Sequence, residues 1–146
     1  MFRFLTAGES HGRGLSVIIE GAPAGLTLTE DYITGDLARR QIGYGRGGRM
    51  LIEQDTAEIL SGVRHGLTMG SPISIWIQNR DWVNGKGPDG VPWQDSMSLL
   101  PTDKNFETIT NLRPGHADTA GTAKYFQEDA RNILERSSAR ESAARV

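Results

Sequence analysis

The alternation of apolar and polar positions predicts strands at the beginning and in the middle of the chain. Residues 2–6 alternate, and residues 15–20 (LSVIIE) are β-branched and typical of a more buried strand. The clearest alternation lies at residues 73–78 (ISIWIQ), which places three isoleucines on one face. Shorter strands are predicted at residues 50–53 and 57–63. The pattern therefore indicates a sheet with one strongly apolar face.

An early segment has the apolar spacing and the end signals of a helix. It begins at Thr29, a favourable N-cap residue, and its apolar face includes Ile33 and Leu37. Arg39 and Arg40 fall in its last turn, where positive charge interacts favourably with the helix dipole. We therefore expect this helix to end close to the glycine-rich segment that follows.

A second helix is expected to begin with Asp118 as its cap and to run to about Leu134. One side of this helix is apolar and consists of Ala123, Phe126, Ala130 and Ile133. Residues 81–98, rich in Gly and Pro, are predicted to form a long loop. Strands first, with one helix early and one late, indicate an α+β fold, an antiparallel-rich sheet with helices packed on it.

Composition narrows the class of protein. The 146 residues suit one domain, and 18 Gly with 37% apolar residues favour a fold rich in strands and loops. A net charge of −2 gives no general attraction for nucleic acid. The absence of Cys and of any His or carboxylate metal spacing leads us to expect no metal. Without a signal peptide or a long apolar run, a cytoplasmic protein with no membrane partner is expected.

His11 is the first candidate for chemistry. It follows Ser10 and precedes Gly12 in the connection between the first two predicted strands. Histidine can deliver a proton near neutral pH, and a neighbouring glycine allows a ligand to approach the backbone. Glu9 or Ser10 could fix the tautomer of the ring. The alternative is an ordinary surface histidine in a turn.

His116 is the second candidate. It lies after a Pro-Gly turn and just before the helix expected at Asp118. The positive end of a helix dipole disfavours the imidazolium form, and a nearby Asp opposes that effect, so the two together can tune an acid or base. The alternative is an incidental histidine in a capping turn. His65 lacks any such context and is interpreted as a surface residue.

A Gly-rich segment at residues 43–49 is bordered and interleaved by arginines. They are Arg39, Arg40, Arg46 and Arg49. Backbone N–H groups of a glycine loop bind anions, and guanidinium groups add paired hydrogen bonds to phosphate. The spacing matches neither a Walker A loop nor a dinucleotide-binding fingerprint. A solvated basic loop is the alternative.

Arg136, Ser137 and Ser138 offer a guanidinium and two hydroxyls beyond the second predicted helix, a composition that suits phosphate. A solvated helix end is the alternative. The tryptophans are interpreted as packing or loop anchors, and they are Trp76, Trp82 and Trp93.

Taken together, several blocks along the whole chain closely resemble the chorismate synthase family, in family order. The blocks are GESHG followed by LSVIIEG, DLARR with GYGRGGR, EILSGV, RPGHAD and RSSARE. The resemblance implies conversion of 5-enolpyruvylshikimate 3-phosphate to chorismate, a 1,4-elimination of phosphate without net redox change. It also implies reduced FMN as the cofactor, with NADPH as a reductant in some members.

The resemblance also implies roles for individual residues. His11 would protonate the departing phosphate, and His116 would act on the reduced flavin. Arg40 and Arg46 match positions tied to the phosphorylated substrate or to NADP. The FMN-contacting segment corresponds to Arg136, Ser137 and Ser138. Further phosphate ligands would be Arg49 and Arg39.

At the level of the whole molecule, the resemblance implies a β-α-β sandwich assembled as a homotetramer. Residues 1–146 would be the N-terminal part of a single domain, ending inside the FMN-contacting signature, with further FMN contacts beyond Val146. Such a piece alone is expected to be inactive. Two other hypotheses are a noncatalytic fragment that serves only folding or assembly, and a nucleotide-binding or flavin reductase module.

Overall fold

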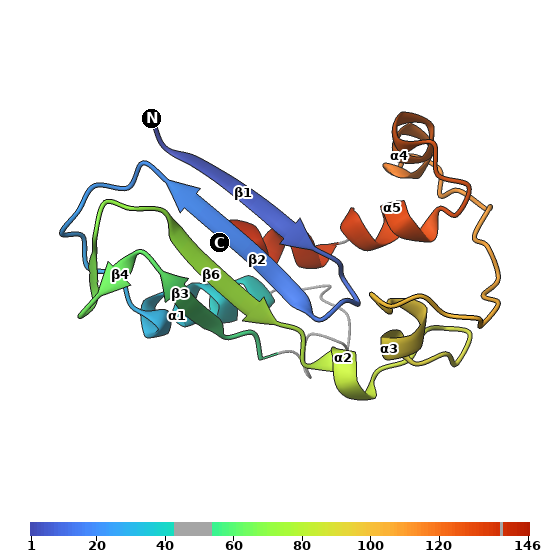
Figure 1. Cartoon of the computed structure of the whole chain (residues 1–146), viewed down its shortest axis with the longest axis horizontal. Helices are drawn as coiled ribbons and strands as arrows, with labels where there is room; N and C mark the ends of the chain where they lie inside the picture. The colour runs from blue at the N-terminus through green and yellow to red at the C-terminus, as the bar shows by residue number, and fades with distance from the viewer. Residues whose placement is uncertain (43–53, 138) are drawn as a thin grey trace.

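Four strands form one antiparallel sheet in a computed structural model that describes residues 1–42, 54–137 and 139–146 (Figure 1). The strand order is β1-β2-β6-β3. The strands are β1 (Arg3–Gly8), β2 (Gly14–Glu20), β6 (Ile73–Gln78) and β3 (Ala57–Ser61). Every neighbouring pair runs antiparallel. The strands predicted at residues 2–6, 15–20 and 73–78 are therefore confirmed.

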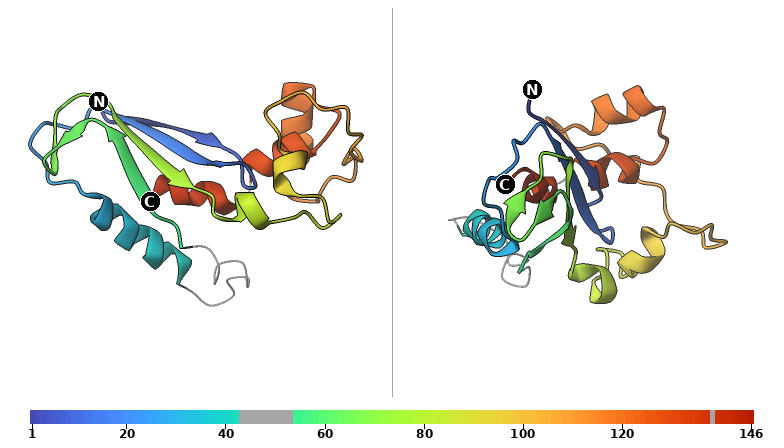
Figure 2. Two further views of the ribbon diagram at one scale, coloured as in Figure 1. Left: turned by 60° about the horizontal axis from the view of Figure 1, so that its bottom comes forward. Right: turned by 60° about the vertical axis from the view of Figure 1, so that its left-hand side comes forward.

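One face of this sheet forms the core. Val17 pairs with Ile75 and Leu15 with Ile77, so the apolar positions of β2 and β6 lie side by side. Helix α1 (Glu30–Gln41) and the 3₁₀ helix η2 (Ala139–Arg145) cover this face, as Figure 2 shows. Leu37 of α1 is completely buried there. Burying each large aliphatic side chain contributes about 2 kcal/mol. The α+β class with helices on an antiparallel sheet is confirmed.

Helix α1 begins as the sequence predicts. The Thr29 hydroxyl accepts a hydrogen bond from the Tyr32 N–H at 3.2 Å, which satisfies one of the free donors of the first turn. The helix ends at Gln41. The Gly-rich segment at residues 43–49 and the strand predicted at residues 50–53 lie outside the described residues.

The strand expected at residues 57–63 is shorter than predicted. It ends at Ser61 because Gly62 has a φ of +82°, a conformation that redirects the chain. A small hairpin follows, made of β4 (Val63–Arg64) and β5 (Leu67–Thr68). His65 lies exposed in its turn, as expected. The predicted loop at residues 81–98 contains two short helices, α2 (Asp81–Asn84) and α3 (Trp93–Ser96).

The single helix predicted from Asp118 to about Leu134 is wrong. The structure has two helices, α4 (Asp118–Tyr125) and α5 (Arg131–Arg136). Phe126 adopts a left-handed conformation with a φ of 54° and is 91% exposed, so it ends α4 instead of joining an apolar face. The break lets α4 pack on α5, where Gly121 lies against Ile133. No helix among the described residues is both long and apolar enough to cross a membrane.

Candidate functional site

The turn between β1 and β2 carries His11 at the end of the sheet nearest α5 (Figure 1). The buried amide of Asn79 donates to the carbonyl oxygens of Ser10 at 3.2 Å and Gly12 at 2.8 Å. The Asn79 backbone N–H donates to the Arg13 carbonyl at 3.0 Å. These three bonds tie the turn to the end of β6. The turn is therefore a fixed platform for the His11 side chain.

Glu135 of α5 holds His11 directly. Its Oε2 accepts a hydrogen bond from the His11 backbone N–H at 2.8 Å, and its Oε1 lies 2.8 Å from the ring Nδ1. The Glu135 carbonyl oxygen also accepts from the Ser10 N–H at 2.9 Å. The sequence pointed to Glu9 or Ser10 as the partner of the ring. The structure assigns that position to Glu135, 124 residues away along the chain.

Trp93 covers one face of the His11 ring. The two ring centroids are 3.8 Å apart and the ring planes are inclined by 21°, which is a stacked arrangement. The indole Nε1 donates to Asp81 at 3.1 Å, so α3 is fastened to α2. Trp93 is 8% exposed. Trp93 is thus a packing residue, as predicted, and it packs on the ring of His11, the candidate acid.

His11 lines a groove of about 560 Å³ at this end of the molecule. The charged residues of the lining are Arg113, Arg131, Asp89, Glu107 and Glu135. Arg131 approaches Asp89 at 3.9 Å and donates to the Glu107 carbonyl oxygen at 3.3 Å. Arg113 is the more solvent-accessible cation, with 53% of its side chain exposed. The groove therefore combines a histidine with an accessible positive charge.

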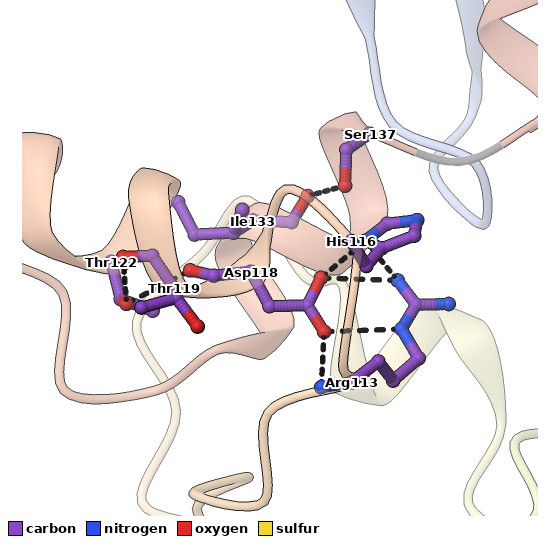
Figure 3. Close-up of polar contacts among 7 residues, drawn as sticks. All are labelled: Arg113, His116, Asp118, Thr119, Thr122, Ile133 and Ser137. Carbon is purple, nitrogen blue, oxygen red and sulfur yellow. Dashed lines mark hydrogen bonds and ion pairs between the residues drawn. The ribbon is translucent and has the colours of Figure 1, made fainter.

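Asp118, at the start of α4, organises the second candidate histidine. Figure 3 shows the Arg113 guanidinium and the His116 ring both directed at its carboxylate. Arg113 donates to it through the backbone N–H at 2.9 Å and through Nε at 3.1 Å. The hydrogen bonds from Arg113, with a smaller one from His116, hold the pKa of Asp118 well below its usual range, although burial alone would raise it.

The His116 Nδ1 atom lies between an acceptor and a donor. It is 2.5 Å from Asp118 Oδ1 and 3.0 Å from Arg113 Nη2. Because an ionised carboxylate only accepts hydrogen bonds, the shorter contact favours Nδ1 as the donor to Asp118. Asp118 was expected to cap α4, but the cap residue is Ala117, and the Asp118 side chain bonds to Arg113 and His116 instead.

Arg113 connects the two histidines. It lines the groove together with His11, and it contacts His116 through its guanidinium. His116 itself does not line that groove. Arg113 is thus shared by the groove of His11 and the cluster of His116 and Asp118.

Arg136, the last residue of α5, contacts strand β1 and helix η2. Arg136 donates to the Thr6 carbonyl oxygen at 3.0 Å and pairs with Glu141 at 3.3 Å, and 42% of its side chain is exposed. The Ser137 hydroxyl donates to the Ile133 carbonyl oxygen at 2.7 Å (Figure 3).

Burial of Glu141 would raise its pKa, but hydrogen bonds from Arg145 and Thr6 and the nearby positive charges lower it. Ser138 lies outside the described residues.

The arginines of α1 do not line the His11 groove. Arg40 is buried and lies 3.4 Å from Asp55, and its Nε donates to the Ser142 hydroxyl at 2.9 Å. Asp55 also accepts from Arg140 at 2.9 Å. Arg39 is exposed and pairs with Asp36 on its own helix. Arg46 and Arg49 lie outside the described residues, so the predicted phosphate role of this arginine set stays a prediction.

Comparison with known proteins identifies the family of this chain. The family model described as chorismate synthase matches residues 2–146. The chain belongs to the chorismate synthase family. Among its relatives, the chorismate synthase of Moorella thermoacetica is 62% identical over 100% of this chain and 36% of its own length. The chorismate synthase of Aquifex aeolicus is 60% identical over 99% of this chain and 34% of its own length.

A solved structure supports the same assignment. The chain is similar to a structure titled "Crystal Structure of Chorismate Synthase", with a TM-score of 0.67 and 47% sequence identity. The match covers 99% of this chain and 30% of the other. The chain therefore spans about a third of the length of the family members it matches.

Three residues of the site were missed by sequence reasoning. Glu135, Asn79 and Arg113 all contact the candidate histidines or their turn. Arg113 is the first residue of the RPGHAD block and Glu135 directly precedes the RSSARE block, so proximity to those blocks was the available signal. Asn79 has no comparable signal, because its role depends on which strand end lies beside the turn.

Proposed function

We propose that the full-length protein eliminates phosphate from 5-enolpyruvylshikimate 3-phosphate to give chorismate. The observation that carries the proposal is the chorismate synthase family match over residues 2–146. In this reaction the C6–H bond and the C–O bond to phosphate break, a new C=C bond forms, and phosphate leaves. In net terms the hydrogen at C6 is lost as a proton, which balances the proton that the departing phosphate takes up. No net oxidation occurs. The groove that His11 shares with Arg113 gives the proposal a physical basis.

His11 would supply the proton that the departing phosphate oxygen takes up. Negative charge grows on that oxygen as the C–O bond lengthens, so a nearby acid and cation lower the barrier. Arg113 offers that cation, because half of its side chain is exposed and it lines the same groove. Arg131 contacts Asp89 and Glu107 and has 14% of its side chain exposed, whereas Arg113 pairs with Asp118 and is the more exposed of the two. We therefore assign charge stabilisation to Arg113 before Arg131.

Reduced FMN, when bound, would supply electron density to the substrate as phosphate departs. Arg136 and Ser137 fit an anionic cofactor in their chemistry, since one is a partly exposed guanidinium and the other a hydroxyl one residue further on. His116 would hold a proton for the flavin side of the site. The Asp118 carboxylate, 2.5 Å from Nδ1, would orient the ring.

The proposal is tested with a full-length chain that carries this segment. Under anaerobic conditions, reduced FMN and substrate are mixed with the protein, and chorismate and free phosphate are measured together. We expect equal amounts of both products from the wild type. We also expect kcat to fall about 100-fold or more in His11→Ala and His116→Ala, with smaller changes in KM. Wild-type protein that releases neither product would refute the function.

The 146-residue chain on its own is expected to form no chorismate. The reason is that it matches only about a third of the length of its relatives. The same assay with this chain checks the expectation, and a flavin titration followed by fluorescence shows whether it binds FMN. Rapid product formation by the chain alone would show that this segment contains a complete site.

A further inference from the structure

We propose that Glu135 is the positioning residue that fixes the ring of His11 with Nδ1 protonated, so that Nε2 is the nitrogen that transfers the proton. This inference rests on the proposed function, because it assigns an atom to a step of that reaction. It concerns a residue for which the sequence motifs indicated no role. It deepens the assignment of His11 from a residue to one nitrogen.

The contact geometry leaves each Glu135 oxygen with a defined partner. Oε2 accepts the His11 backbone N–H at 2.8 Å, while Oε1 lies 2.8 Å from Nδ1. Nδ1 also lies 3.0 Å from Oε2, so the ring nitrogen faces the whole carboxylate. An ionised carboxylate has acceptors only, and therefore Nδ1 must be the donor in this pair. The neutral ring is then the Nδ1–H tautomer.

The ring has little freedom to leave this arrangement. The Glu135 side chain is 8% exposed, and its backbone carbonyl also binds Ser10. Trp93 stacks on the face of the His11 ring at 3.8 Å and restricts tilting. Glu135 restricts rotation in the ring plane, because a flipped ring would lose the Nδ1 hydrogen bond. Together the two residues hold the imidazole in one orientation at the edge of the groove.

This arrangement suits a general acid. In the protonated ring, Glu135 retains the Nδ1 proton and Nε2 carries the proton to be given away. As the substrate C–O bond breaks, the Nε2–H bond breaks and a new O–H bond forms on the departing phosphate. The ring that remains is the neutral Nδ1–H tautomer, which the carboxylate continues to hold. The same carboxylate thus stabilises the ring before and after transfer.

A purely structural role for Glu135 is the competing interpretation. In that case Glu135 would only fasten the His11 turn to α5 through the backbone N–H groups of Ser10 and His11. The two roles differ in what Glu135→Gln should do. The single Gln oxygen can accept the His11 backbone N–H, but the amide NH₂ then faces Nδ1 as a donor. The variant therefore keeps the hydrogen bond to the His11 backbone N–H and favours the Nε2–H tautomer of the ring.

The experiment uses the full-length chain labelled with ¹⁵N-histidine, with the His11 signals assigned by their absence in His11→Ala. In the wild type at a pH where the ring is neutral, we expect ¹⁵N shifts of an Nδ1–H tautomer. In Glu135→Gln we expect the Nε2–H tautomer, a fall in kcat on the order of 100-fold, and a KM within about threefold of wild type. Glu135→Asp retains the charge and is expected to recover part of kcat.

Glu128→Gln is the matched control, because it removes the same charge from an exposed position just before α5. It should leave both the His11 shifts and kcat unchanged. A wild-type ring in the Nε2–H form would overturn the proposal, and so would a Glu135→Gln variant that keeps kcat within about threefold of wild type. If Glu135→Gln does not fold, the wild-type shifts and Glu135→Asp still decide. If wild-type protein forms no chorismate, the proposed function fails, while the ¹⁵N shifts still test the pairing.

Discussion

The Asn79 side-chain amide donates to the Gly12 carbonyl oxygen at 2.8 Å, which joins the end of β6 to the turn that carries His11. The same amide nitrogen also donates to Ser10, and both contacts are buried. A backbone carbonyl that loses its partner away from water costs free energy. The position of the candidate acid therefore depends on a neutral amide at the end of a neighbouring strand.

Asn79→Ala should lower the free energy of unfolding by about 2–3 kcal/mol, because two buried carbonyl oxygens lose their donor. Urea unfolding followed by circular dichroism measures the change. Asn84→Ala serves as the control, since Asn84 is exposed at the end of α2. Its effect should stay within about 0.5 kcal/mol. Equal effects for the two variants would contradict the role of Asn79.

The ion pair of Asp118 should make stability depend on pH in the acidic range. The pKa of Asp118 is lower in the folded chain than its unfolded value of about 3.9. Such a group stabilises the fold above the unfolded pKa, and this contribution is lost as the pH falls through the folded value. The stability difference between wild type and Asp118→Asn should therefore be constant near pH 6 and shrink below about pH 4.

Unfolding by urea at a series of pH values tests this dependence. Asp103→Asn is the control, because Asp103 is an exposed carboxyl in the extended segment before α4. We expect it to differ little from wild type over the same range. A wild-type advantage over Asp118→Asn that grows on acidification would have the wrong sign for a lowered pKa.

Two helical glycines should respond to alanine in opposite directions. A Cβ on Gly121 of α4 would meet the Ile133 side chain of α5, so Gly121→Ala must push the two helices apart. We expect a loss of about 1–3 kcal/mol. Gly35 lies inside α1, where a Cβ would have no neighbouring atom within 4 Å, and Gly35→Ala should gain roughly 0.5–1 kcal/mol. Thermal unfolding of both variants measures the contrast.

Removing Asp55 should destabilise the fold strongly. Its carboxylate faces Arg140 at 2.9 Å and Arg40 at 3.4 Å, and all three side chains are at least nine-tenths buried. Asp55→Ala should therefore cost about 3–5 kcal/mol. Asp36→Ala breaks the exposed pair with Arg39 and should cost less than about 1 kcal/mol. Urea unfolding compares the two, and similar losses would mean that burial of the pair has no special weight.

Residue patterns within single segments predicted individual strands and the start of one helix. The alternation at Ile73, Ile75 and Ile77 identified a strand and its buried face, and Thr29 identified the start of α1. The break at Phe126 was missed, because the apolar spacing continues through it. The left-handed conformation of Phe126 ends α4, and the break lets Gly121 pack against Ile133 of α5, a tertiary contact that the spacing does not encode.

The sequence singled out the two histidines of the candidate site but not their partners. His11 and His116 could be chosen from their turn contexts, but the ring partner of His11 lies 124 residues away. Asp118 was recognised as important and given the role of a helix cap, whereas its carboxylate serves Arg113 and His116. Contacts between distant segments follow from topology, and a single sequence does not state which strand ends meet.

The 3₁₀ helix η2 places Ala143 and Ala144 in the core of the sheet, within a few residues of Arg136 and Ser137. The helix η2 therefore packs in the apolar interior and also pairs with Arg136 through Glu141. A substitution in η2 can change both the stability of the fold and the position of Arg136. Stability and ligand affinity must therefore both be measured before either is interpreted. The Arg136 guanidinium is thus held on one side by Thr6 of the sheet and on the other by Glu141 of η2.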